Sequence, residues 1–343
     1  MINSLREYLE TACERKASDL HISVGIPPTI RTNGELVALE RPDITPEDTE
    51  TMIRSILSDE QLAKLNSQGE LDFSFSIPKL SRFRVNAFRQ RSCLSLAFRV
   101  IPQNIPDLAS LHLPDELRAL SHRSHGLLLV TGPAGSGKST TLAALVDDMN
   151  KNARKHVITL EDPIEYLHKH NQCIIQQREV GSDTQSFAVG LRAALREDPD
   201  VILVGELHDM DTIRTALTAA ETGHLVLAAM HTSDAVSTVN RLIDIFPAEQ
   251  QGQIRVQLAA ELAAVISQRL FPTSDFSGRR VATEVMINNK NIGHLIREGK
   301  IYQIPSVIQV DHASGMQTMA SCIQGLLARK AIATDAVVPL LKR

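Results

Sequence analysis

Alternating polar and apolar residues dominate the first hundred positions of the chain. The runs "DLHISV", "PTIRTNGELVAL", "LDFSFSI", "SRFRVNAF" and "LSLAFRV" predict short strands, and Gly and Pro residues between them favour turns. An opening helix is expected to reach about Arg15. The spacing of Met52, Ile56, Leu62 and Leu65 predicts a helical stretch within "TPEDTETMIRSILSDEQLAKLN". Residues 1–100 therefore predict a small α+β domain, a sheet with helices on one side.

The pattern changes after residue 100. Three prolines in "IPQNIPDLASLHLPDEL" interrupt regular structure, so residues 101–116 are interpreted as a linker. The long apolar runs "GLLLVTG", "HVITLED", "PDVILVGE" and "HLVLAAMHT" then favour parallel strands buried between helices. We expect a doubly wound α/β domain over residues 117–343. From about Ala248 onward the chain is expected to be mostly helical, including one helix through "AEQQGQIRVQLAAELAAVISQRL".

Composition narrows the class of protein. The 343 residues are 43% hydrophobic and 22% charged, as in soluble globular proteins, and the net charge of −4 argues against a surface built to coat nucleic acid. The four cysteines lie far apart without any C-x-x-C pair, so no zinc or disulfide framework is indicated and a reduced cytosolic location fits. No signal-peptide core or membrane-length apolar run is present in the sequence, so only peripheral membrane contact is expected.

One motif carries clear chemistry. "LLLVTGPAGSGKSTTLAAL" reads as a strand, a G-x-x-x-x-G-K-S loop and a helix, the order that a phosphate-binding loop requires. Glycines in the loop let backbone N–H groups point at phosphate oxygens, Lys138 reaches the β and γ phosphates, and the Ser139 hydroxyl ligates Mg²⁺. The predicted cofactor-binding residues are Gly132, Pro133, Ala134, Gly135, Ser136, Gly137, Lys138, Ser139 and Thr140.

Carboxylates follow two further predicted strands. "HVITLEDPIE" brings Glu161, Asp162 and Glu165 to a strand end, where a carboxylate can take a proton from an attacking water or hold a metal through water. "DPDVILVGELHD" places Glu206 at the end of another buried strand, which suits a Walker B role on the metal side. Because ligands bind at the carboxyl ends of parallel strands, we expect these groups to converge near the phosphate loop.

Two histidines bracket the run "GHLVLAAMHT". A strand separates His224 and His231 by about 23 Å, whereas two ligands of one zinc ion lie within about 4 Å of each other, so a shared metal is excluded. His231, at the carboxyl end, is expected on the nucleotide edge. His224 follows Gly223, a predicted helix C′ residue, and is a candidate for a helix cap or a subunit interface.

A series of motifs, in order, resembles the secretion and pilus ATPases that form hexameric rings, and among them the twitching-motility retraction branch. "ASDLHI" is similar to the family's N-terminal signature, "RFRVNAF" to its basic strand and "GPAGSGKSTT" to its Walker A motif. "EDPIEY" resembles its aspartate box, "GELHD" its Walker B motif and "TGHLVLAAMHT" its histidine box, while "HLIREGK" and "GMQT" resemble the retraction branch. The resemblance covers nearly the whole chain.

The resemblance implies a PAS-like N-terminal domain followed by a RecA-like P-loop domain with a helical C-terminal segment. It implies that ATP and Mg²⁺ are the cofactors, that Glu165 is the general base, that Glu206 acts on the metal side and that His231 contacts the γ-phosphate region. Arginines that act in trans are implied as well, with Arg82, Arg84 and Arg99 as candidates. The implied partners are five further copies in a homo-hexamer and an inner-membrane platform protein, with the ring at the cytoplasmic face of that membrane and no nucleic acid.

Several functions stay open at this point. The leading hypothesis is a hexameric Mg-ATPase that powers pilus retraction; the alternatives are a pilus-assembly or secretion-loading ATPase, and a nucleotide-switched ring without motor activity. His208 and "NIGH" at 291–294 depart from the retraction branch, which bears on the coupling of hydrolysis to retraction. A RecA-like nucleic-acid translocase would need basic residues interleaved with aromatics, yet the chain has no Trp and three Tyr.

Overall fold

The computed structural model describes residues 2–32, 34–101, 104–275 and 278–337. The chain divides into two compact units, unit 1 (Met1–Asn104) and unit 2 (Ile105–Arg343), and each is described by itself. Pro102 and Gln103 of the predicted linker lie outside the described residues. The rest of that segment from Ile105 onward belongs to unit 2 and contains a short 3-10 helix, η1 (Leu108–Leu111).

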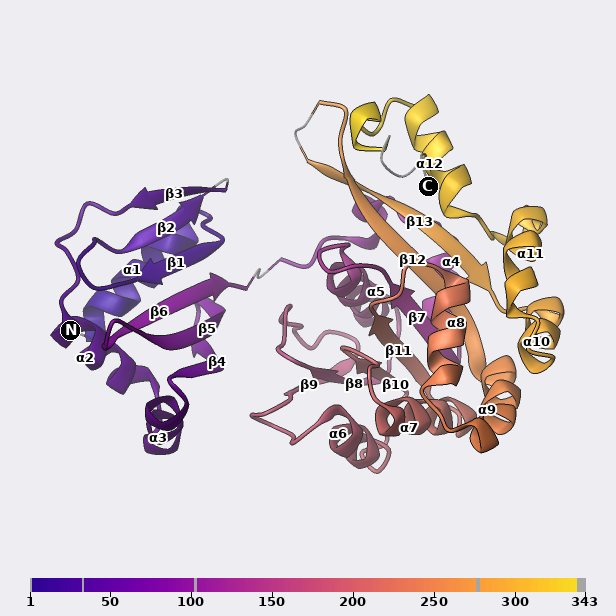
Figure 1. The fold of residues 1–343 in the computed structure, drawn as a ribbon, viewed down its shortest axis with the longest axis horizontal. Helices are drawn as coiled ribbons and strands as arrows, with labels where there is room; N and C mark the ends of the chain where they lie inside the picture. The colour runs from indigo at the N-terminus through magenta and orange to yellow at the C-terminus, as the bar shows by residue number, and fades with distance from the viewer. Residues whose placement is uncertain (1, 33, 102–103, 276–277, 338–343) are drawn as a thin grey trace. The chain divides into compact units, whose positions relative to one another are not determined.

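Unit 1 is an antiparallel six-stranded sheet in the order β3-β2-β1-β6-β5-β4 (Figure 1). Its strands are β1 (Asp19–Ile22), β2 (Thr29–Thr32), β3 (Glu35–Ala38), β4 (Glu70–Ile77), β5 (Ser81–Gln90) and β6 (Cys93–Val100). Its helices are α1 (Ile2–Glu14), α2 (Pro46–Ile56) and α3 (Asp59–Gln68). Alternate residues of β5 face the helices, with Phe83, Val85 and Ala87 fully buried against one core. The predicted sheet with helices on one side is confirmed.

The helical stretch predicted within residues 45–66 is confirmed and forms two helices, α2 and α3. The first helix ends at Ile56, and Ser58 begins the second, because its hydroxyl accepts from the Gln61 N–H while the Gln61 side chain accepts from the Ser58 N–H. This reciprocal capping box makes Ser58 a helix start. The spacing of apolar residues continues from the first helix into the second, so it does not reveal the break between them.

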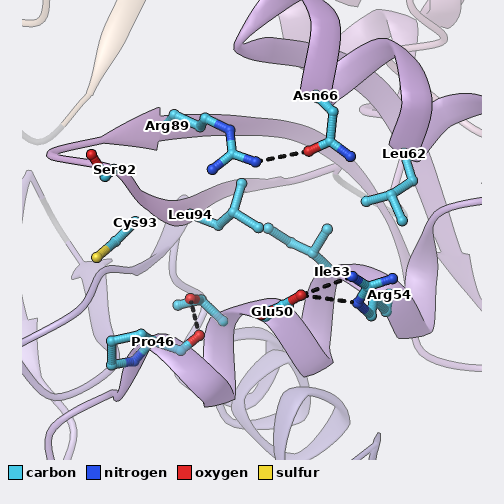
Figure 2. Close-up of a pocket in the computed structure, with 11 residues that line it drawn as sticks. Pro46, Glu50, Ile53, Arg54, Leu62, Asn66, Arg89, Ser92, Cys93 and Leu94 are labelled. Atoms are coloured by element: carbon cyan, nitrogen blue, oxygen red, sulfur yellow. Dashed lines mark hydrogen bonds and ion pairs between the residues drawn. The ribbon is translucent and has the colours of Figure 1, made fainter.

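A pocket of about 230 Å³ lies between α2, α3 and the β5–β6 hairpin of unit 1 (Figure 2). Two arginines that line this pocket have partners within the unit. Arg54 forms an ion pair with Glu50 at 2.8 Å, and Arg89 donates to the Asn66 side-chain oxygen at 2.7 Å. Both guanidinium groups therefore already have acceptors in unit 1.

Unit 2 is built on a seven-stranded sheet in the order β13-β12-β7-β11-β10-β8-β9, in which all neighbours are parallel except β12 and β13. The strands are β7 (Gly126–Thr131), β8 (His156–Glu161), β9 (Ile174–Glu179), β10 (Val201–Val204), β11 (Leu225–Met230), β12 (Leu262–Pro272) and β13 (Arg279–Ile287). The four predicted apolar runs thus form β7, β8, β10 and β11, and the α/β fold with its RecA-like core is confirmed.

Helices cover both faces of this sheet. Successive residues of β7 point to opposite cores: Leu128 and Val130 pack with α5 and α4, whereas Leu127 and Leu129 pack with α6 to α9. The helices of unit 2 are α4 (Glu116–Ser121), α5 (Lys138–Asn152), α6 (Phe187–Ala194), α7 (Met210–Glu221), α8 (Ala235–Asp244), α9 (Ala248–Glu261), α10 (Lys290–Arg297), α11 (Ile304–Val310) and α12 (Met319–Ala328), with 3-10 turns η1, η2 (Ile301–Gln303), η3 (His312–Ser314) and η4 (Thr334–Ala336). Within the described residues, none of these helices combines the length and apolar character that crossing a bilayer demands.

The single helix predicted from Ala248 through "AAVISQRL" is wrong beyond Glu261. Helix α9 ends there, and the next eleven residues form β12, which pairs with β7. Val265 and Ile266 are fully buried, and such β-branched residues favour a pleated strand. Helices α10 to α12 do follow, but two long strands precede them (Figure 1).

Candidate active site

The loop after β7 has the form that its glycines predict. Gly132 has φ +147°, and a Cβ atom on it would lie 2.4 Å from the Gln268 carbonyl oxygen and 2.5 Å from Ser136 Oγ. Only glycine fits there. Gly137 has φ +91° and caps the N-terminus of α5, so the loop opens onto the positive end of a fifteen-residue helix. Pro133, Ala134 and Gly135 form its exposed crest.

Lys138 is a nearly buried cation at the base of this loop, with 8% of its surface exposed. Its Nζ donates to the carbonyl oxygens of Gly132 at 2.9 Å and Pro133 at 3.0 Å. Burial lowers the pKa of Lys138, while the more distant charges of Glu206 and Glu165 act in the opposite direction. No carboxylate in the described part of the chain lies within 4 Å of Nζ, so the ammonium group lacks an ionic partner that a phosphate would supply.

Ser136 adds a second unsatisfied group. Its Oγ is buried and has no hydrogen-bond partner among the described residues. A buried hydroxyl without a partner costs free energy unless a ligand or water satisfies it. Together with Lys138, which has no carboxylate partner among the described residues, and with the glycine cradle, it shows that the loop fits a phosphate group.

The carboxyl ends of four parallel strands meet at the same edge. Met230 of β11 is in register with Thr131 of β7, and Val204 of β10 with Leu160 of β8. Glu206 follows β10 and His231 follows β11. His231 Nδ1 lies 3.3 Å from Lys138 Nζ, and His231 Nε2 lies 3.6 Å from a Glu206 carboxylate oxygen. The structure thus brings these three predicted residues together.

The acidic cluster after β8 is divided between two environments. Glu161 turns inward: burial raises its pKa, and it accepts hydrogen bonds from Thr159 Oγ1 at 2.6 Å and Gln177 Nε2 at 3.0 Å. Glu165 and Asp162 are exposed. The Glu165 N–H donates to Glu161 Oε2 at 3.4 Å, so Glu161 supports the loop that presents Glu165. Of the three carboxylates, Glu165 and Asp162 are available to solvent and ligands.

His224 lies at the amino end of β11, and His231 lies at the carboxyl end of the same strand. Its Nδ1 lies 2.9 Å from the Ala219 carbonyl and 3.2 Å from Thr222 Oγ1, so it meets the C-terminal end of α7. Gly223 has φ +101° immediately after the cap residue of that helix, which confirms the predicted C′ glycine. Within the chain, His224 is therefore a helix-capping group.

The three arginine candidates lie on the outer face of the unit 1 sheet. Arg82 and Arg84 alternate with buried Phe83 and Val85 on β5, and Arg84 stands opposite Arg99 of β6 in the register. Arg99 is also paired with Asp19, with Nε 3.0 Å from the carboxylate. The chain itself thus presents a short basic row on this face, and Arg99 within it is held by the Asp19 carboxylate.

Residues that the sequence did not single out complete the site's support. Tyr166 OH lies 2.9 Å from Thr140 Oγ1, and Gln177 Nε2 donates to both Glu161 and the Tyr166 carbonyl. Gln268 of β12 is 1% exposed and donates to Thr141 Oγ1 at 2.8 Å behind the loop. In the sequence, only Tyr166 stood in a recognised motif, as the last residue of "EDPIEY". Gln177 and Gln268 could not be placed near the site because the strands that carry them, β9 and β12, were not predicted.

Comparison with known proteins decides the family. The model of the family described as "Type II/IV secretion system protein" matches residues 1–332. The chain belongs to the type II/IV secretion system protein family. Among relatives in this family, the type IV pilus retraction ATPase PilT of Pseudomonas aeruginosa is 44% identical over 331 residues, 96% of each chain.

Two further members of the type II/IV secretion family are similar over most of the chain. A twitching motility protein of Neisseria gonorrhoeae is 45% identical over 309 residues, covering 90% of this chain and 83% of that protein. The crystal structure of the pilus retraction motor PilT with bound ADP matches with a TM-score of 0.90 at 46% identity, covering 98% of this chain and 95% of that one.

Proposed function

We propose that this protein is an Mg-ATP-hydrolysing hexameric motor that powers type IV pilus retraction. It is an ATPase by family, and its similarity to pilus retraction ATPases extends over nearly the whole chain. The observation that carries the proposal is the arrangement of Lys138, His231 and Glu206 beside the phosphate-binding loop. Lys138 supplies a cation for phosphate, Glu206 supplies a carboxylate, and His231 lies between them within hydrogen-bonding distance of one and ion-pair distance of the other.

The residues present fit ATP and Mg²⁺. Lys138 and the loop amides would hold the phosphates, and the Ser139 hydroxyl with Glu206, through water, would hold the metal. The chemistry that Mg²⁺ would supply there is neutralisation of the charge on the phosphate oxygens. Glu165 is exposed at the neighbouring strand end and would accept the proton of the attacking water. Phosphoryl transfer needs mostly positioning and charge stabilisation, which these fixed groups supply.

The assembled form follows from the same proposal. Arg82, Arg84 and Arg99 would reach a nucleotide in a neighbouring copy, and six copies would form a ring at the cytoplasmic face of the inner membrane against a platform protein. Arg99 would have to leave Asp19, which gives the ring a way to detect whether a neighbour is loaded. His224 stays a candidate for the subunit interface beside its capping role.

The test compares Mg²⁺-dependent ATPase activity of the wild type with Lys138→Ala and Glu206→Ala, with size measured in parallel. We expect activity in the wild type alone and a hexamer in the presence of nucleotide. Expression in a Pseudomonas aeruginosa strain that lacks its retraction ATPase should restore twitching, and Lys138→Ala should not. Wild-type hydrolysis no higher than that of the variants would contradict the motor.

A nucleotide-switched ring without motor output is the second candidate. It is favoured by His208, which replaces the arginine of the retraction branch and is 56% exposed beside Asp209 and the Phe187 ring. Nucleotide binding with hydrolysis no higher than that of the variants would select this candidate, whereas ATPase activity without restored twitching would select the assembly or secretion-loading alternatives. Stimulation of hydrolysis by single-stranded DNA would instead point to a translocase.

A further inference from the structure

A pair of hydroxyl groups joins the phosphate loop to the acidic loop. Thr140 Oγ1 and Tyr166 OH are 2.9 Å apart. Thr140 lies in the first turn of α5, next to Ser139, and Tyr166 is next to Glu165. The two loops follow β7 and β8, which are separated in the sheet by β11 and β10. This contact therefore links two parts of the site that are not neighbours in the sheet.

The acidic loop is held rigidly to its own strands at the same place. Gln177 of β9 donates to the Tyr166 carbonyl at 2.8 Å, and its side-chain oxygen accepts from the His168 N–H at 2.8 Å. The Ile164 N–H donates to a Glu179 carboxylate oxygen at 3.0 Å. These bonds hold the acidic loop together as one unit, so a restraint on the Tyr166 hydroxyl acts on the same short segment that carries Glu165.

The chemistry of hydroxyl groups makes this link sensitive to phosphate. Each hydroxyl donates one hydrogen bond and accepts two, so without a ligand either oxygen of the pair can be the donor. A phosphate oxygen only accepts. If Thr140 donates to one, its lone pairs remain for Tyr166, which must then be the donor, and the resulting chain of two hydrogen bonds is mutually strengthened.

We propose that Tyr166 is a positioning residue that makes the placement of Glu165 depend on a phosphate bound at Thr140. This inference rests on the proposed ATPase function and deepens it. In this proposal Tyr166 acts through Thr140 and the acidic loop rather than on the reacting phosphate or the water. Its effect is to couple occupancy of the loop to the orientation of the base, so that hydrolysis is favoured only when the nucleotide is fully seated.

Steady-state kinetics of the full-length protein provide the first test. Tyr166→Phe removes only the hydroxyl, and loss of one hydrogen bond should lower kcat about three- to tenfold while KM for Mg-ATP and Kd for ADP stay within about twofold. Tyr302→Phe is the matched control, because that tyrosine is 73% exposed and lies in η2 of the C-terminal part. Thr140→Val should lower both ADP affinity and kcat, and adding Tyr166→Phe to it should lower kcat no further. A Tyr166→Phe kcat within twofold of wild type, or additive effects in the double variant, would overturn the proposal.

Hydrogen exchange provides a test that does not depend on hydrolysis. Mg-ADP should slow the exchange of backbone amides in residues 162–172 of the wild type and of Tyr302→Phe, and should do so much less in Tyr166→Phe. If the wild type binds ADP and shows this protection but does not hydrolyse ATP, the proposed function fails and the coupling stands. If ADP binds without protecting the loop, or protects it equally in Tyr166→Phe, the coupling is refuted. Failure of ADP to bind would refute both.

Discussion

Asp148 holds the segment at the start of unit 2 against the helix of the phosphate loop, and its neutralisation should weaken unit 2. This carboxylate of α5 is 8% exposed and meets two residues of the α4 region. Arg118 Nη2 lies 3.1 Å from Oδ1 and its Nε 3.3 Å from Oδ2, while His122 Nε2 lies 2.9 Å from Oδ2. Asp148→Asn keeps the shape of the side chain and removes its negative charge. It also replaces one carboxylate oxygen by an NH₂ group, which cannot accept a hydrogen bond from Arg118 or His122.

The expected loss follows from these contacts. Hydrogen bonds to a charged acceptor contribute about 1.5–3 kcal/mol each, but Arg118 is 58% exposed and water recovers part of its loss, so we expect about 2 kcal/mol in total. The entropy of unfolding of a unit of this size is about 0.5 kcal/mol/K, so Tm should fall by about 4 °C.

Calorimetry of the nucleotide-free protein measures this change, and the transition of unit 2 is identified as the one that ADP raises. Asp147→Asn is the matched control: Asp147 is the adjacent residue and pairs with Lys151, which is 48% exposed, so its Tm should change by about 1 °C or less. If Asp148→Asn shifts Tm no more than Asp147→Asn does, the reasoning about the buried carboxylate is refuted.

Three further predictions concern the region around the site. Burial lowers the pKa of His168 to about 4; the unfolded chain therefore takes up the proton first, and the free energy of unfolding should fall by at most about 3 kcal/mol as pH drops from 6.5 to 4. Urea unfolding across this range should show a shallower pH dependence for His168→Gln than for wild type, and an unchanged one for the exposed His125→Gln. Gly132→Ala should abolish ADP binding and destabilise unit 2 by about 2 kcal/mol or more, because its Cβ atom would clash with the Gln268 carbonyl and Ser136. Gly135→Ala, with φ +74° but open space around it, should cost about 1 kcal/mol in the same nucleotide-free thermal unfolding experiment. Equal losses of stability in the two variants would contradict the steric argument. Asp209 caps α7 by accepting from the Thr212 N–H at 2.8 Å, so Asp209→Ala should lower stability by about 1 kcal/mol, and a neutral result in thermal unfolding would show that the cap is dispensable.

The sequence was sufficient for those parts of the fold that local pattern determines. The runs that became β7, β8, β10 and β11 are largely apolar because both faces of each strand are buried over most of its length, and their order placed Glu206 and His231 at one edge with Lys138. The glycine loop was equally clear, since its spacing reflects backbone conformations that other residues do not adopt.

Other parts depend on tertiary contacts that no local pattern records. "LAAVISQRLFP" has helix-forming residues and follows a helix, yet it becomes β12 because a place beside β7 buries Val265 and Ile266. β9 was missed because "IIQQRE" sits at the sheet edge with mixed polarity. The inward turn of Glu161 and the reach of Tyr166 to Thr140 depend on Gln177 of that strand, so they could not be inferred without it.

Strand β12 gives the C-terminal part of the chain direct access to the phosphate loop. The Gln268 carbonyl closes against Gly132 and the Leu270 side chain against Gly137, while the same strand pairs along its length with β13, which bridges through Val285 to Gln317 of "GMQT". A load applied to the C-terminal helices would therefore arrive at the nucleotide through a hydrogen-bonded ladder, which resists stretching far more than a flexible loop does. Force on these helices should accordingly alter the rate of hydrolysis, so that the turnover rate would depend on the load that they carry.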